Sequence, residues 1–152
     1  MKKTILTILL CGVMVLGITG CGNSKNEFDV GKKSNIQISQ NDVSLSIKDG
    51  TLKNTSATLV LTNNSDKNFQ YGNPYEIEIK KDGEWHKINV ELDFNLPVFV
   101  LKSKETKEIE LNWENGYGKL AKGTYRIIKD IDYEKSEGNF ETFNIAVEFN
   151  ID

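Results

Sequence analysis

Few residues of this 152-residue chain could carry chemistry, and those few are scattered. His86 is the single histidine, and Cys11 and Cys21 are the two cysteines. A catalytic triad needs a histidine beside a nucleophile, and a zinc site needs several nitrogen or sulfur ligands. One histidine, and no cysteine after position 21, therefore argue against both sites. We expect no enzyme, no bound metal and no cofactor.

An acidic stretch is the other candidate for chemistry: Asp130, Asp132, Glu134 and Glu137 lie close together in the sequence. Alternating oxygen ligands suit Ca²⁺. However, lysines interrupt the stretch and it has no EF-hand loop pattern, so a solvated face is the favoured interpretation. A calcium-dependent module, or an accessory subunit of a membrane complex, is kept as an alternative.

The first 20 residues are organised like an export signal. Lys2 and Lys3 give a positive start, residues 4–19 are uncharged and mostly apolar, and small residues close the segment. The uncharged run is shorter than the roughly 20 residues that a membrane-spanning helix needs. We therefore predict a signal peptide at residues 1–20 rather than a permanent membrane helix.

The end of this signal, Ile18-Thr19-Gly20-Cys21, resembles the lipobox of bacterial lipoproteins. The resemblance implies cleavage between Gly20 and Cys21, a diacylglycerol thioether on the cysteine sulfur, and acylation of the new amine by a chain such as palmitate. The alternative is a plain cleaved signal with a free thiol. Because Cys11 is removed with the signal, Cys21 has no disulfide partner, and a lipid accounts for it. We expect a cell-membrane protein, anchored by lipid and facing the extracellular side.

Composition bounds the rest of the chain. Loss of Lys2 and Lys3 with the signal changes the net charge from −3 to −5, and an acidic chain without a basic cluster argues against a nucleic-acid partner. Residues 21–40 are polar and have too few apolar side chains to fold alone, so we expect a lipidated flexible tether there. Residues 41–152 are left as one domain, which must be stable without disulfides.

Alternation of apolar and polar residues with period two dominates this domain and predicts β-strands. The alternating segments are residues 43–47, 57–62, 75–80, 84–90, 109–113, 125–127 and 143–151. About seven short strands at this spacing predict an antiparallel β-sandwich.

One hairpin is specified in detail by its turn. Asp82-Gly83 between two alternating segments favours a two-residue type I′ turn, because both central residues then need positive φ. The turn sets a register in which Lys80 faces Trp85, and in which a second pair, Glu78 and Lys87, lies on the same polar face (residues directly opposed across strands share a face). The opposite face carries the apolar residues Tyr75, Ile77, Ile79, Ile88 and Val90.

Residues 120–125 match the pattern L-x-x-G-x-Y of the tyrosine corner, in which a tyrosine hydroxyl bonds back to the backbone at a crossing between sheets.

These patterns together resemble a known family of domains. Residues 43–128 are similar to the bacterial immunoglobulin-like domains of small Gram-positive lipoproteins. The matching segments are residues 59–65, 71–72, 76–78, 82–85, 111–113, 117–118 and 123–127. The resemblance implies an immunoglobulin-like sandwich at the cell surface and a non-enzymatic binding module, with an unknown surface protein or cell-wall component as partner.

Two places are candidates for that partner. Trp85 lies on the polar face of the hairpin, and an exposed tryptophan is a common interface anchor; packing on the Lys80 stem is the structural alternative. Phe99 lies in the apolar run of residues 94–101, where Pro97 excludes a central strand and favours an edge or a crossing loop. This run also fits the outline of a bacterial proteinase-inhibitor family, which makes a protease or hydrolase inhibitor the main alternative function.

Overall fold

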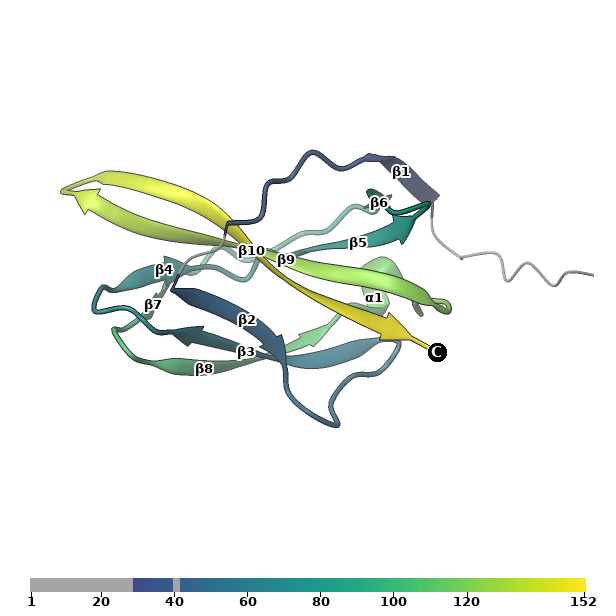
Figure 1. The fold of residues 1–152 in the computed structure, drawn as a ribbon, viewed down its shortest axis with the longest axis horizontal. Helices are drawn as coiled ribbons and strands as arrows, with labels where there is room; N and C mark the ends of the chain where they lie inside the picture. The colour runs from purple at the N-terminus through teal and green to yellow at the C-terminus, as the bar shows by residue number, and fades with distance from the viewer. Residues whose placement is uncertain (1–28, 40–41) are drawn as a thin grey trace, which may run out of the picture.

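The structure is a computed structural model that describes residues 29–39 and 42–152 (Figure 1). The predicted export signal and the predicted lipidation site at Gly20 and Cys21 lie outside these residues. The described chain is an antiparallel β-sandwich, which confirms the predicted fold class. No helix among the described residues is long and apolar enough to cross a membrane.

The sandwich is built from ten strands and one short helix within the described residues. They are β1 (Asp29–Lys33), β2 (Val43–Ile47), β3 (Ser56–Asn63), β4 (Phe69–Tyr71), β5 (Glu76–Lys81), β6 (Glu84–Asn89), β7 (Phe99–Leu101), β8 (Thr106–Asn112), α1 (Glu114–Tyr117), β9 (Gly123–Ser136) and β10 (Asn139–Ile151).

A large and a small sheet face each other. In the large sheet β9 pairs with β10 on one side, while β5 and β4 pair in line along its other side. Beyond β5 the sheet continues through β6 to β1, and beyond β4 it continues to β7. The small sheet has the order β2-β3-β8. Figure 1 shows the turn of the β9–β10 hairpin and strand β1 toward opposite ends of the molecule.

The β5–β6 hairpin has the predicted turn and register. Asp82 has φ 51° and Gly83 has φ 83°, as a type I′ turn requires. Lys80 faces Trp85 as predicted. The expected side-chain pairing is partly wrong, because Lys87 faces Glu78 across the strands but forms its ion pair with Glu76. Glu78 is buried and turns to β9 instead.

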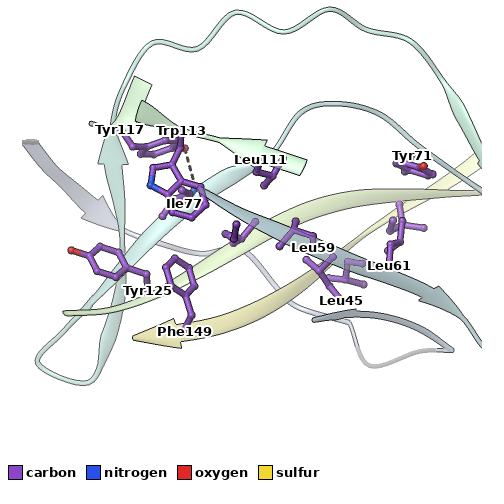
Figure 2. Packing of buried hydrophobic residues seen from close by; sticks show 14 of the residues in the cluster. Leu45, Leu59, Leu61, Tyr71, Ile77, Leu111, Trp113, Tyr117, Tyr125 and Phe149 are labelled. Carbon is purple, nitrogen blue, oxygen red and sulfur yellow. Dashed lines mark hydrogen bonds between the residues drawn. The ribbon is translucent and has the colours of Figure 1, made fainter. Parts of the chain in front are cut away.

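The core lies between the two sheets and holds the predicted alternating residues (Figure 2). Its largest fully buried side chains include Trp113 and Tyr125. The Tyr125 hydroxyl donates to the Ala121 carbonyl at 2.8 Å, which confirms the tyrosine corner. Nearby, the Tyr117 hydroxyl accepts from the Ile77 amide at 2.9 Å and satisfies a buried donor of β5. These two bonds fix the end of the sandwich where α1 lies.

Residues 29–39 differ from the expected flexible tether. Strand β1 pairs with β6, with Asp29 opposite Asn89 and Lys33 opposite His86. The chain then crosses the large sheet, because the Ser34 amide donates to a carbonyl of β6 at 2.8 Å and the Ser39 amide donates to a carbonyl of β10 at 2.8 Å. Polar composition did not prevent this, since a strand added to a sheet edge is held by backbone bonds that need few apolar side chains.

Candidate binding surface

The face of the large sheet that points away from the core has two halves of different character. We call residues 34–39 the strap. The closed half is the part of β5 and β9 next to the strap, where Glu78, Arg126 and Ile128 are buried although they point away from the core. The open half is the part between β7 and β9, beyond the strap.

The closed half is organised around one buried ion pair. The Arg126 guanidinium contacts Glu78 Oε2 through Nε at 2.7 Å and through Nη2 at 2.6 Å. Glu78 is fully buried, and its other oxygen, Oε1, has no hydrogen-bond partner among the described residues. A buried carboxylate depends on its cation, because an uncompensated buried charge is costly. This pair therefore couples β5 to β9 in the closed half.

Trp85 belongs to the closed half and is half-buried. The Arg126 guanidinium lies 4.7 Å from the centre of its ring, and the Lys80 amine lies 5.1 Å from it. Cations over an aromatic face are attracted by the ring quadrupole. The ring is thus engaged by cations of its own chain, as the structural alternative for Trp85 requires, and its role in partner binding stays a prediction.

The open half exposes the apolar run that contains Phe99. Leu96 is 77% exposed, Val98 67% and Val100 49%, whereas Leu101 is fully buried. Phe99 is 40% exposed, and its ring packs on Tyr71 with 5.3 Å between centroids. The run ends in the short edge strand β7, which pairs only with β4 in the described chain. Edge placement after Pro97 is as predicted, and it leaves several apolar side chains in solvent.

The same half brings two acidic residues beside that run. Residues 96–98 line a slot of about 170 Å³ together with Tyr71, Gly72, Pro74, Asp130 and Asp132; we call it the acidic slot. Val100 lies opposite Gln70, and Gln70 lies opposite Asp132, so the three side chains form a row across β7, β4 and β9. Neighbouring strands are about 4.8 Å apart, which places Val100 on the order of 10 Å from Asp132. The sequence offered both features but no sign that they meet.

Within the described chain, Asp130 and Asp132 form no ion pair, although the Thr142 hydroxyl donates to Asp132. The remaining acids of the stretch lie nearer the turn of the β9–β10 hairpin, where Glu134 accepts from the Gly138 amide at 2.9 Å. Among residues 29–39 and 42–152, no three histidine, cysteine, aspartate or glutamate side chains are placed to hold a metal ion. The acidic slot therefore offers apolar contact and negative charge.

Lys129 marks the boundary between the two halves. Strands β4 and β5 are interrupted at residues 72–75, and the Lys129 amine donates to the Gly72 carbonyl at 2.8 Å and to the Pro74 carbonyl at 2.9 Å. Burial lowers the pKa of this amine to about 8, while the charge of neighbouring Asp130 acts in the opposite direction. A side chain therefore supplies the donors that a continuous strand would give to these carbonyls.

Other candidates are less suited to binding. His86 is half-buried on β6, with Nδ1 3.4 Å from the Gly31 carbonyl, as a structural histidine would be. A larger groove of about 570 Å³ lies near the turn of the β9–β10 hairpin and has Phe69, Tyr133 and Phe143 among its lining residues. The Lys67 amine lies 4.6 Å from the Tyr133 ring centre, so part of this aromatic lining is covered.

The fold can be compared with known proteins. Residues 39–150 match the family model described as a bacterial Ig-like domain. This range contains strands β2 to β9 and nearly all of β10. No curated protein and no solved structure matches the chain significantly. Bacterial Ig-like domains are generally non-enzymatic binding or structural modules.

Proposed function

Because the chain belongs to the bacterial Ig-like domain family, we propose that it is a lipid-anchored surface protein whose sandwich binds a partner outside the cell, through the open half of the large sheet. The observation that carries the proposal is the exposed apolar row of Leu96, Val98 and Val100 beside the carboxylates of the acidic slot. Contiguous apolar surface with a polar rim is characteristic of interaction sites.

The chemistry of the open half suits contact better than turnover. Its aliphatic side chains can be removed from water by a partner at about 25 cal/mol per Å², and its carboxylates can select the partner by charge. The closed half is less suited to this role, because its charges and its tryptophan are already engaged within the chain. The choice between the halves can therefore be tested directly.

Site-specific photo-crosslinking in intact cells tests the binding site. A photoreactive residue is placed at Val98, and a matched one is placed at Glu110, which is exposed on β8 of the small sheet. We expect a discrete crosslinked adduct from position 98 and none from position 110, identified by mass spectrometry as a surface protein or a cell-wall fragment. Equal labelling at both positions, or none at position 98, would reject the open half as the binding site.

The lipid anchor is tested separately. Cells are fed an alkyne analogue of palmitate, and the wild-type protein is compared with the Cys21→Ser variant. We expect the wild-type protein to carry the label and to be found in the membrane fraction. The variant should carry no label. A wild-type protein that is unlabelled and released into the medium would refute lipidation while leaving the binding site open to its own test.

A second function, inhibition of a protease or hydrolase, is favoured by one observation. The segment before β7 has no regular secondary structure, and its Leu96 side chain is exposed. A loop that inserts into an active site needs such an exposed side chain. This function predicts stoichiometric inhibition that is lost in a Leu96→Ala variant and reduced in Phe99→Ala. A panel of secreted proteases that stays fully active at equimolar protein would exclude it for those enzymes.

A further inference from the structure

Resting on the proposed function, we infer that the partner of the acidic slot is a protein segment that presents a lysine or arginine side chain between apolar neighbours. The slot has apolar walls from Leu96, Pro97 and Val98, and Asp130 and Asp132 line it as well. A long basic side chain combines the same two properties, because its methylene stem is apolar and its head is charged.

Charge complementarity selects this class of partner. Asp132 is half-buried and Asp130 is exposed, and neither forms an ion pair within the described residues. A cation that enters the slot would find two carboxylates whose ion-pairing capacity is free. The nearest buried cation, Lys129, already donates to two backbone carbonyls and lies on the alternate side of β9 from these two aspartates. It therefore does not take the place of an incoming basic group.

The arrangement of the strands also sets the reach that the side chain needs. Val100 and Asp132 are separated by Gln70 on the intervening strand, a spacing on the order of 10 Å. A short acidic or hydroxyl side chain would not bridge this spacing, whereas the stem of lysine or arginine lies across Gln70 as its head approaches Asp132. Apolar residues on either side of the basic residue would then cover Val98 and Val100.

A peptide titration followed by nuclear magnetic resonance tests the inference on the full chain. The probe is a short blocked peptide with one arginine between two valines. Its two controls replace the arginine with citrulline, which has nearly the same shape without the charge, or with glutamate. We expect chemical-shift changes centred on Val98, Asp130 and Asp132, with affinity at least about tenfold lower for citrulline and no binding for glutamate. Equal affinity for arginine and citrulline, or no shift with arginine at millimolar peptide, would overturn the inference.

Variants with matched charge loss separate this inference from the proposed function. The Asp130→Asn/Asp132→Asn protein is compared with Glu108→Gln/Glu110→Gln, which removes two charges from exposed positions of the small sheet. We expect about tenfold weaker arginine-peptide binding in the first variant and unchanged binding in the second. If the adduct at position 98 persists in the Asp130→Asn/Asp132→Asn cells, the binding module stands and the basic partner is refuted. If the protein with the photoreactive residue at position 98 and both aspartates intact gives no adduct, the proposed function fails, whatever the result of the peptide titration.

Discussion

The two halves of one sheet face differ in how their charged side chains are accommodated. Both carry charged side chains on the side of the large sheet that points away from the core. In the closed half Glu78 and Arg126 are buried and neutralise each other, and the Trp85 ring lies against the guanidinium. In the open half Val98 and Asp130 remain exposed, although Asp130 also lines a cleft with Ile36 of the strap. Charge on a sheet face is therefore either satisfied within the fold or left available to a partner, and burial distinguishes the two.

The largest effect expected from this comparison is at Glu78. Glu78→Ala leaves the Arg126 charge uncompensated in a buried place, and we expect the free energy of unfolding to fall by on the order of 3–5 kcal/mol in a denaturant titration. Replacing both members of the pair with methionine is the control, and it should cost much less, because no lone charge remains. A loss below about 1 kcal/mol in Glu78→Ala would show that this half is not closed.

A smaller effect is expected from pH at the boundary between the halves. The pKa of Lys129 is lowered to about 8 in the folded chain, whereas an unfolded lysine titrates near 10.4. Between these values the unfolded chain binds the additional proton, so stability rises with pH. From pH 8 to 9.5 we expect the wild type to gain about 1.5 kcal/mol relative to Lys129→Met.

The upper limit of that titration is set by buried tyrosines, of which Tyr117 has a pKa raised by burial even further than that of Tyr125. Burial raises the pKa of the Tyr125 phenol to about 12, so an unfolded tyrosine loses its proton first and stability falls above pH 10. Measurements are therefore confined to pH 9.5 and below. Parallel curves for the wild type and Lys129→Met across this range would mean that the amine keeps an ordinary pKa in the fold.

An effect of similar size concerns Trp85 and decides between its two roles. In Trp85→Ala the contacts with Arg126 and Lys80 are lost, and we expect a cost of about 1–2 kcal/mol in thermal or denaturant unfolding, with an unchanged adduct at position 98. The opposite result, full stability together with a lost adduct, would make Trp85 a contact of the partner and would move the binding site to the closed half.

The smallest effect on stability is expected in the open half. Asp130→Asn/Asp132→Asn removes no ion pair of the described chain, and asparagine retains an acceptor for the Thr142 hydroxyl. We expect the free energy of unfolding to change by no more than about 0.5 kcal/mol. A destabilisation above 2 kcal/mol would place these carboxylates among the structural charges and would remove the contrast with Glu78.

Much of the fold was predictable because it depends on local pattern. The β5–β6 register follows from a two-residue turn, and the tyrosine corner follows from the spacing of Gly123 and Tyr125. Strands β1 and β4 were not among the predicted strands, and β7 was expected only as an edge strand or a crossing loop. Two of them have only three residues, too few to show an alternation, and β1 is polar and is held by the backbone of β6. Their positions depend on pairing with distant strands rather than on their own composition.

The candidate site was predictable only in parts. The apolar run at Phe99 and the acids at Asp130 and Asp132 were each identified, but their proximity arises because β4 lies between β7 and β9. The burial of Glu78 was missed for a similar reason. A glutamate on an alternating strand is expected to face solvent, and only the pairing of Glu78 with Arg126 of the neighbouring strand β9 changes this.

Strand β1, which directly precedes the strap, also has a consequence for the order of folding. Asp29 meets Asn89 across 60 residues, whereas the β5–β6 and β9–β10 hairpins join neighbours in the chain. Closing a long loop costs more entropy than closing a hairpin, so we expect β1 to dock onto a sheet that has already formed. Amide hydrogen exchange at Val30 that is as slow as at Ile127 would contradict this order. If the order holds, the face that is covered in the native state is the last to close during folding and the first to open by local unfolding.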